Sequence, residues 1–173
     1  VENVAVLRAR GVHIVEPEAG RLAGGDIGTG RLADVASIVA AVERVLGPRD
    51  LEGTAVVVSA GGTREPIDAV RVIANRSSGK QGYAVAAEAA SRGARVTLVS
   101  TVSLAVPAGV ELVAVETADE MQRAMVTAAA DHDVIVMSAA VADFRPKAVA
   151  DGKLKKRDGT PEIILEPTPD ILA

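Results

Sequence analysis

The sequence predicts an α/β fold in which a parallel sheet carries helices on both faces. Short apolar runs rich in Val and Ile alternate with helical runs between residues 54 and 138. Near-continuous apolar strands are typical of parallel strands that are buried on both faces. Hydrophobic residues make up 49% of the chain and aromatic residues only 1%, so the core must consist of Val, Ile, Leu and Ala. A Rossmann-like arrangement follows from these observations.

Residues 48–173 hold most of the expected elements. Helices are expected at 79–92, which Gly93 closes, and at 117–130, where a capping box opens the helix. Because the run at 133–138 is fully apolar in its interior, we expect it to be a central strand. The expected strands are 54–59, 95–100, 111–115, 133–138 and, more weakly, 162–165.

Residues 1–47 are expected to form a separate unit. They contain a helical fragment at 1–8, a candidate strand at 11–15, a glycine-rich loop at 16–31 and a helix that Asp34 can cap. These pieces are too few to bury a core, so we interpret them as the tail of a preceding domain plus a connecting helix. The alternative is a phosphate-binding loop at 25–30, which lacks a flanking switch from strand to helix.

Composition excludes several classes of function. The net charge of −4 argues against general nucleic-acid binding, which favours a basic surface. With no cysteine and only His13 and His132, a thiolate site, a His-based triad and a multi-His metal site are not expected. No apolar run has the length of a membrane span, so we expect no membrane association and a cytoplasmic location.

An unusually long connection follows the first strand of the main domain. Residues 60–78 separate that strand from the next helix, whereas loops beyond roughly 12–15 residues are usually functional or disordered. A strand, a glycine-bearing loop and a helix together place anions at the helix N-terminus. We therefore interpret the connection as a binding loop, with a solvated insertion as the alternative.

Polar residues of this loop suit anion and acyl-group binding. Ser77, Ser78 and Gly79 precede the helix and form either a cradle for phosphate or an ordinary helix cap. Asn75 offers uncharged amide donors, which suit a carbonyl oxygen that gains negative charge during acyl transfer. Positive charge selects Arg64, Arg76 and Lys80 as further candidates. The candidate substrate-binding residues are Gly61, Gly62, Arg64, Asn75, Arg76, Ser77, Ser78, Gly79 and Lys80.

A second segment is expected to face this loop across one crevice. Gly61 and Gly62 follow the first strand, and Ala139 and Ala140 follow the strand at 133–138. Ligands of open parallel sheets bind at the carboxyl ends of the strands. The small residues after the second of these strands allow a flat base to approach the backbone. Asp143 can accept hydrogen bonds from a ribose, or it can be a solvated side chain.

Basic residues are concentrated in the segment that follows. We interpret this run as a flap that closes over a triphosphate, and a solvated charged face is the alternative. The residues concerned are Lys147, Lys153, Lys155, Lys156 and Arg157.

Three ordered blocks resemble the signatures of a known family. They are AGGTREPIDAVRVIANRSSGKQG at 60–82, SAAVADFRPKAVADGKLKK at 138–156 and TPDIL at 168–172. Together they resemble phosphopantothenoylcysteine synthetase, the ligase half of the bifunctional coenzyme A biosynthesis proteins of bacteria. The resemblance covers residues 54–173.

The resemblance implies a CTP-dependent ligase. In that family 4′-phosphopantothenate is activated as an acyl-cytidylate and then joined to cysteine, with Mg²⁺ present. It implies that Asn75 acts on the acyl intermediate and that Lys153 contacts the nucleotide, and it implies a homodimer. No residue is identified as a metal ligand. The residues implied to line the CTP site are Met137, Ser138, Ala139, Asp143, Lys153, Pro169, Asp170, Ile171 and Leu172.

The glycine-rich loop at 16–31 resembles the substrate flap of the decarboxylase half of the same proteins. Gly24 stands where that family carries a cysteine, so decarboxylation is not expected. FMN belongs to the decarboxylase half, which is absent here. Because the family continues beyond its TPDIL segment, residues 48–173 are expected to be a ligase domain that is incomplete at its C-terminal end.

Two alternatives remain from other classes of protein. A nicotinamide-dependent oxidoreductase predicts a short GxGxxG turn after the first strand and an acidic residue that ends the second. The sequence instead has AGGTREP, and its second strand ends at Val99-Ser100. The other alternative is a non-catalytic dimerisation or regulatory module. The residues alone do not decide between CTP and ATP.

Overall fold

The computed structural model describes residues 2–156 and 159–172. The chain divides into two compact units, Val1–Arg49 and Asp50–Ala173. Arg157, one of the predicted flap residues, lies outside the described residues.

The first unit is small and contains little buried surface. Helix α1 (Glu2–Ala9) precedes an antiparallel hairpin of β1 (Glu18–Arg21) and β2 (Ile27–Arg31), and α2 (Val35–Leu46) follows. Asp34 caps α2 as predicted, because its carboxylate accepts a hydrogen bond of 2.6 Å from the Ser37 amide. Residues 11–15 form no strand, and the predicted loop at 16–31 contains the hairpin. Neither helix has a buried residue in its described part, which agrees with a unit that lacks its own core.

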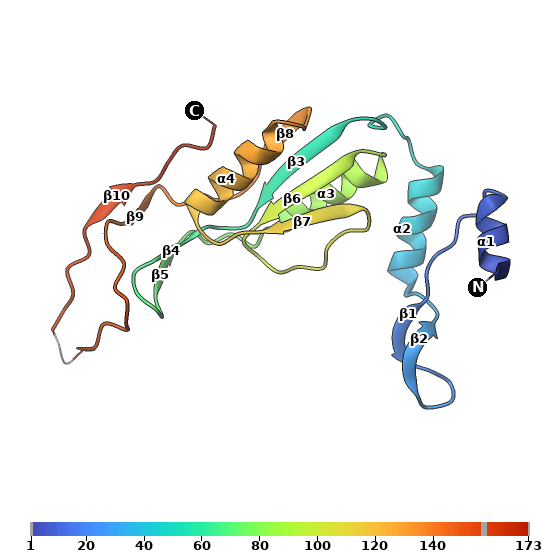
Figure 1. The fold of residues 1–173 in the computed structure, drawn as a ribbon, viewed down its shortest axis with the longest axis horizontal. Helices are drawn as coiled ribbons and strands as arrows, with labels where there is room; N and C mark the ends of the chain where they lie inside the picture. Colours follow the sequence, from blue (N-terminus) through green and yellow to red (C-terminus); the bar gives the residue numbers. More distant parts are fainter. Residues whose placement is uncertain (1, 157–158, 173) are drawn as a thin grey trace. The chain divides into compact units, whose positions relative to one another are not determined.

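The second unit is built on a four-stranded parallel sheet (Figure 1). The strands are β3 (Ala55–Ala60), β6 (Arg95–Ser100), β7 (Val110–Ala114) and β8 (Val134–Met137), in the order β7-β6-β3-β8. Strand β3 is buried along its whole length because it pairs with β6 on one side and β8 on the other. Because all the pairings are parallel, the carboxyl ends of the four strands lie on the same side of the sheet.

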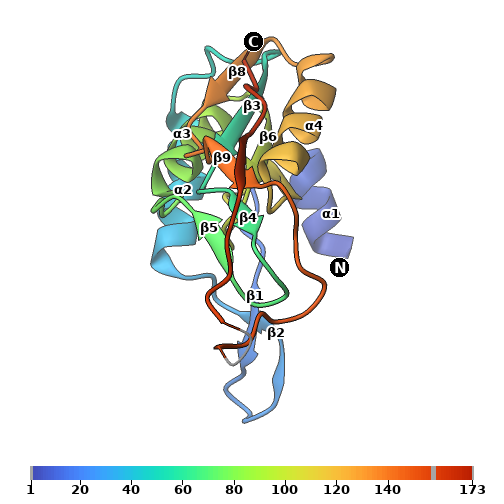
Figure 2. The same ribbon diagram turned by 90° about the vertical axis from the view of Figure 1, so that its left-hand side faces the viewer.

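Two helices cover opposite faces of this sheet, α3 (Lys80–Ser91) and α4 (Ala118–Ala129) (Figure 2). Val58, Tyr83 and Leu98 belong to the buried cluster beneath α3. Val57, Val99, Met121 and Met125 form the cluster beneath α4. The predicted α/β class is confirmed. The predicted capping box is also present, between Thr117 and Glu120 at the start of α4.

Two further predictions about strands were wrong. Strand β8 is at an edge of the sheet, with Val134 and Ile135 exposed, so its apolar run did not indicate a central position. The expected strand at 162–165 is replaced by β10 (Leu165–Pro167), which pairs antiparallel with β9 (Phe144–Pro146) outside the main sheet. A proline in each of these strands suits a short edge pair, since proline cannot donate to a ladder. The long connection contains a hairpin of β4 (Arg64–Pro66) and β5 (Val72–Ala74).

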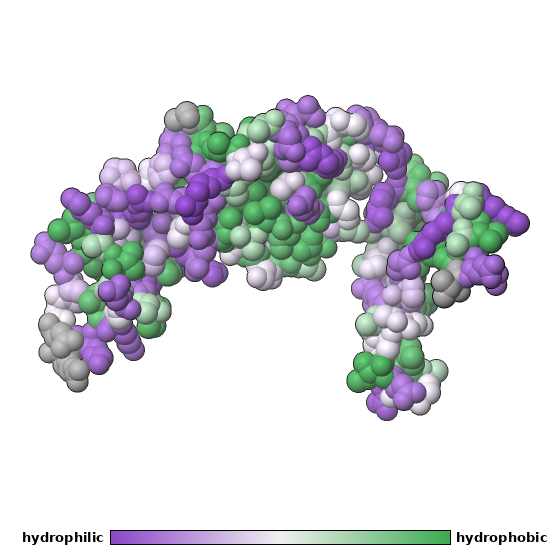
Figure 3. Space-filling model, in the orientation of Figure 1, coloured by the Kyte–Doolittle hydropathy of each residue, from purple (hydrophilic) through white to green (hydrophobic). Residues whose placement is uncertain are grey.

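The sheet face beside α4 is only partly covered. Figure 3 shows apolar residues gathered there, bordered by hydrophilic ones. A groove of about 630 Å³ runs between β6, β7 and α4. His132 is among its residues, and its Nε2 lies 2.9 Å from Thr97 Oγ1, so this histidine is held within the fold. No helix in the described part of the chain is long and apolar enough to cross a bilayer.

Gly82 allows α3 to approach β3 closely, which gives a test of the packing. A Cβ added at Gly82 would lie 2.6 Å from Ala60 Cβ and 2.7 Å from the Ser59 carbonyl oxygen. Alanine is better than glycine in a helix by about 1 kcal/mol, but overpacking costs about 1–3 kcal/mol. We expect Gly82→Ala to lower the free energy of unfolding in denaturant titration. Gly152→Ala is the control, because nothing lies within 4 Å of its added Cβ. A Gly82→Ala variant as stable as the control contradicts the packing account.

Candidate functional site

The loops that follow β3 and β8 are joined directly by backbone hydrogen bonds. The Ala140 amide donates to the Gly61 carbonyl at 2.7 Å, and the Thr63 amide donates to the Ala140 carbonyl at 3.3 Å. Gly62 and Ala140 thereby form a parallel bridge that extends the β3–β8 pairing beyond both strands. We call residues 59–63 and 138–142, with these contacts, the loop clasp.

Two buried hydroxyl groups complete the loop clasp. Ser59 Oγ accepts hydrogen bonds from the amides of Ser138 at 3.0 Å and Ala139 at 3.1 Å. Thr63 Oγ1 accepts a bond of 2.9 Å from the Ala142 amide. Ser59 and Thr63 are fully buried, so they bind the loops rather than a ligand. The sequence analysis missed both, although a hydroxyl residue at the end of a buried strand is a usable signal.

Asn75 reaches across to the second loop. Its side-chain Nδ2 donates to the Val141 carbonyl at 3.0 Å and lies 3.5 Å from the Ala140 carbonyl. Asn75 is otherwise exposed, so the contact lies at the surface of the loop clasp. The structure thus brings together the two segments that the sequence placed on one crevice.

The glycines of the long connection are needed for close packing. A Cβ at Gly61 would lie 2.2 Å from Thr101 Oγ1, and one at Gly62 would lie 2.5 Å from the Asn75 carbonyl oxygen. At Gly79, φ is +72° and an added Cβ would lie 2.5 Å from Val102 Cγ2. All three glycines are buried, so they shape the loop instead of offering open backbone to a ligand.

The start of α3 has no side-chain cap. Gly79 is the N-cap residue and makes no side-chain capping bond, so neither Ser77 nor Ser78 caps this helix. The first amides of a helix lack intrahelical partners, and the dipole there favours negative charge. Arg76 and Lys80 are exposed beside this turn. Arg64 is also exposed, but it lies on β4, where its amide donates to the Glu116 carbonyl.

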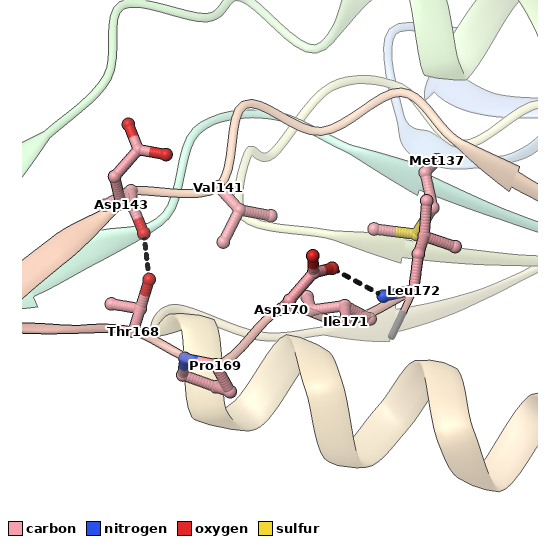
Figure 4. Close-up of a pocket in the computed structure, with 9 residues that line it drawn as sticks. Met137, Val141, Asp143, Thr168, Pro169, Asp170, Ile171 and Leu172 are labelled. Atoms are coloured by element: carbon pink, nitrogen blue, oxygen red, sulfur yellow. Dashed lines mark hydrogen bonds between the residues drawn. The ribbon is translucent and has the colours of Figure 1, made fainter.

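A cavity of about 280 Å³ adjoins the loop clasp (Figure 4). It is formed by the end of β8, the 141–143 segment and residues 168–172. The Thr168 amide donates to the Asp143 carbonyl at 3.0 Å, and the Leu172 amide donates to Asp170 Oδ1 at 2.9 Å. The residues around the cavity are Met137, Val141, Ala142, Asp143, Thr168, Pro169, Asp170, Ile171 and Leu172.

Two other predicted nucleotide residues lie next to this cavity without lining it. The amides of Ser138 and Ala139 are held by Ser59. Ser138 Oγ is buried and has no hydrogen-bond partner within the described residues. Leaving a buried hydroxyl without a partner costs about 1–3 kcal/mol of folding free energy, and the described residues do not offset this cost at Ser138.

Lys153 is not brought into the cavity that contains Asp143. It lines a separate cavity of about 330 Å³ with Arg71, Lys155 and Lys156. Lys153 and its two lysine neighbours are exposed. The predicted nucleotide residues are therefore divided between two places in this structure.

Arg145 holds the antiparallel pair against α4. Its Nε donates to Glu166 Oε1 at 2.9 Å, and its Nη1 donates to Asp119 in the first turn of α4. The bond to Glu166, followed by the bond to Asp119, raises the pKa of Arg145. These contacts fix the exit of the chain from the loop clasp. Within the described residues, no group of three or more His, Asp or Glu is arranged to hold a metal ion.

The fold is that of an α/β domain with an open parallel sheet, a class in which ligands generally bind at the carboxyl ends of the strands. Residues 51–173 match the family described as the DNA/pantothenate metabolism flavoprotein C-terminal domain. The chain belongs to that family.

Curated relatives extend the similarity over the whole chain. The chain is 52% identical over 181 residues to the coenzyme A biosynthesis bifunctional protein CoaBC of Mycobacterium tuberculosis (strain H37Rv), covering 100% of this chain and 43% of the relative. It is 47% identical over 175 residues to the protein of the same name from Vibrio parahaemolyticus, covering 99% and 44%. The chain thus spans less than half the length of these relatives.

Solved structures support the fold. The C-terminal domain of a CoaBC protein is 44% identical and has a TM-score of 0.62, covering 70% of this chain and 57% of that chain. A Cab2 variant in complex with phosphopantothenate-cysteine has a TM-score of 0.59 at 17% identity, covering 81% of this chain and 66% of that chain. The second likeness shows the fold alone.

The buried hydroxyl of Thr63 gives a test of the loop clasp. Thr63→Val keeps the shape of the side chain but leaves the Ala142 amide without its acceptor. Losing the partner of a buried donor costs about 1–3 kcal/mol, so we expect the free energy of unfolding to fall by that amount. Thr127→Val on the exposed side of α4 is the matched control. Equal unfolding free energies for the two variants would contradict the role given to Thr63.

Proposed function

We propose that this chain forms the phosphopantothenate–cysteine ligase part of a coenzyme A biosynthesis protein. The observation that carries the proposal is the contact of Asn75 with the 140–141 carbonyls, which lies next to the cavity lined by Asp143 and Asp170. The printed name of the relatives and their level of identity support the pathway.

The proposed reaction has two steps. The carboxylate of 4′-phosphopantothenate attacks the α-phosphate of CTP, forming an acyl-cytidylate and releasing pyrophosphate. The amine of cysteine then attacks the acyl carbon, forming the amide and releasing CMP and a proton. Neither step needs a nucleophilic side chain, which fits a chain that has no cysteine. The protein must instead position two anionic substrates and stabilise developing charge.

The open start of α3 is proposed to hold the phosphate of phosphopantothenate. Its free amides and dipole attract an anion, and Arg76 and Lys80 add positive charge beside it. Arg64 and the Ser77 and Ser78 hydroxyls are proposed as additional contacts.

The cavity beside the loop clasp is proposed to hold CTP. Its walls contain the small residue Ala142 and the carboxylates of Asp143 and Asp170, which suit a base and ribose hydroxyls. Ser138 and Ala139 are proposed to shape the end of β8 beside this cavity, with their amides held by Ser59. Lys153 is proposed to reach the phosphates from the basic segment at 147–156, as a flap residue that neutralises charge when pyrophosphate leaves.

A Mg²⁺ ion bound to the triphosphate fits this site. Mg²⁺ is usually held by one or two carboxylates together with substrate phosphates, and Asp143 and Asp170 line the same cavity. Asp170 would hold the ion, and Asp143 is left to accept hydrogen bonds from the ribose. Bound there, it would screen the charge of the triphosphate.

Asn75 must change partners to act on the acyl group. In this structure its amide hydrogens face the Ala140 and Val141 carbonyls. A rotation of the side chain would turn one hydrogen toward the acyl oxygen of the intermediate, where it stabilises the charge that develops as cysteine attacks.

Three further features complete the proposal. The active form is proposed to be a cytoplasmic homodimer. FMN is expected to bind only the decarboxylase half of a complete bifunctional protein. Choice of CTP over ATP rests on the family resemblance.

The oxidoreductase alternative has lost its support. It requires a short phosphate-binding turn after the first strand, whereas the β4–β5 hairpin occupies the connection between β3 and α3. A non-catalytic module remains as an outcome of the experiments below.

Pyrophosphate release tests the proposed activity. In the intact protein we expect release to require phosphopantothenate and CTP together, with Mg²⁺, and product amide to appear only after cysteine is added. ATP in place of CTP and NADH with the same substrates are the controls. A protein that releases no pyrophosphate under these conditions contradicts the ligase proposal.

Asn75→Ala tests the division of the two steps. Pyrophosphate should still be released in a single turnover, while amide formation falls by about 10²–10³-fold because one oxyanion donor is lost. Rapid-quench analysis of the acyl-cytidylate and the amide measures both steps. Asn3→Ala, the same change on α1, should leave both rates unchanged. Normal amide formation by the Asn75 variant would show that the proposed role is wrong.

A further inference from the structure

Asp68 is a buried carboxylate that the proposed reaction does not use. It lies between β4 and β5, and its side chain is 0% exposed. Its Oδ1 accepts hydrogen bonds from the amides of Val70 at 2.9 Å and Arg71 at 2.8 Å. A carboxylate so deeply buried is unusual unless it is paired and hydrogen-bonded, so its remaining contacts indicate what it holds.

Those remaining contacts join the hairpin to the basic segment, residues 147–156. Asp68 Oδ2 accepts a bond of 3.0 Å from the Leu154 amide, and the Arg71 guanidinium pairs with the same oxygen. Arg71 Nη2 also donates to the Leu154 carbonyl at 3.0 Å. Both backbone polar groups of Leu154 are therefore held by the Asp68–Arg71 pair.

A second contact fixes the basic segment a few residues earlier. The Ala150 amide donates to the Ile67 carbonyl at 3.1 Å, and Asp68 and Ala150 form a parallel bridge. The segment is thus attached to the hairpin at Ala150 and Leu154. These attachment points bracket Lys153, and Leu154 itself separates Lys153 from Lys155.

The lysines depend on this attachment for their direction. Lys153, Lys155 and Lys156 line one cavity together with Arg71, although all three are exposed and Leu154 between them is only half-buried. The hydrogen bond with Arg71 holds the pKa of Asp68 well below its usual range. The carboxylate therefore stays ionised at neutral pH and can serve as a permanent acceptor.

We propose that Asp68 is a positioning residue that holds the basic segment through Leu154 and so directs Lys153, Lys155 and Lys156 toward the polyphosphate of the substrate nucleotide. The identity of that polyphosphate rests on the proposed function. The attachment itself rests only on the contacts of Asp68 and Arg71.

Asp68→Asn in the intact protein tests this proposal. Asparagine keeps the shape of the side chain, but its amide group would present donors to the Arg71 guanidinium or the Leu154 amide, where only an acceptor fits. Asp151→Asn is the matched control, since it removes the same charge from an exposed position in the basic segment. Arg71→Lys is a milder second variant that keeps the positive charge and loses the forked contact.

Limited trypsin digestion measures the attachment without reference to activity. We expect cleavage after Lys153, Lys155 and Lys156 to be about fivefold faster in Asp68→Asn than in the control, because the segment opens locally more often. Arg71→Lys should fall between them. Equal rates for Asp68→Asn, Arg71→Lys and the control would overturn the proposal, and this holds even if the protein has no ligase activity.

Steady-state kinetics measures the direction of the lysines. We expect Asp68→Asn to raise KM for CTP by about tenfold, while KM for phosphopantothenate changes less than about twofold. A merely structural role would change both KM values together, and that result would overturn the proposal. If Asp68→Asn does not fold, Arg71→Lys decides the question by the same two measurements.

Discussion

The parallel pairing of β3 with β8 continues into the two loops beyond it, and the whole site depends on that continuation. Strand pairing normally ends where the chain turns away to the next helix. Here the Gly61 and Ala140 backbones keep pairing, and the hydroxyls of Ser59 and Thr63 hold the amides that the turn would otherwise leave unpaired. The loop clasp therefore makes one surface out of two segments that are far apart in the sequence.

The close packing of these loops explains why glycine occupies three positions of the long connection. Gly61, Gly62 and Gly79 lie so close to Thr101, Asn75 and Val102 that a side chain on any of them would push the loops apart. Glycine is required at these positions because the loops pack closely against each other. The groups proposed to bind substrate lie next to them, namely Asn75 and the start of α3.

Much of the fold follows from local pattern, and the errors have a common cause. The strands of the sheet, α3, α4 and the Thr117 capping box were predictable because periodicity and capping are local properties. The edge position of β8 and the separate β9–β10 pair were not, since pairing partners are decided by tertiary contacts. The β4–β5 hairpin of the long connection was not predicted, because its strands are too short to leave a periodic signal.

In the candidate site, too, local features were predictable and tertiary contacts were not. The approach of the loops after β3 and β8 was predictable because parallel strands place their carboxyl ends side by side. Ser59, Thr63 and Asp68 were missed, because a buried polar residue is recognised only when its partners are seen. Lys153 lines a different cavity from Asp143, and the attachment of its segment to the hairpin through Asp68 is a tertiary contact that leaves no local sequence signal.

The most direct test of the loop clasp is amide hydrogen exchange at Ala140 and Ala142 in the intact protein. Both amides donate to the opposite loop, so their exchange should be as slow as that of Val58 in the centre of β3. Exchange of both amides as fast as in the exposed loop at Ser103 would show that the two segments are not joined, and the shared crevice would have no structural basis.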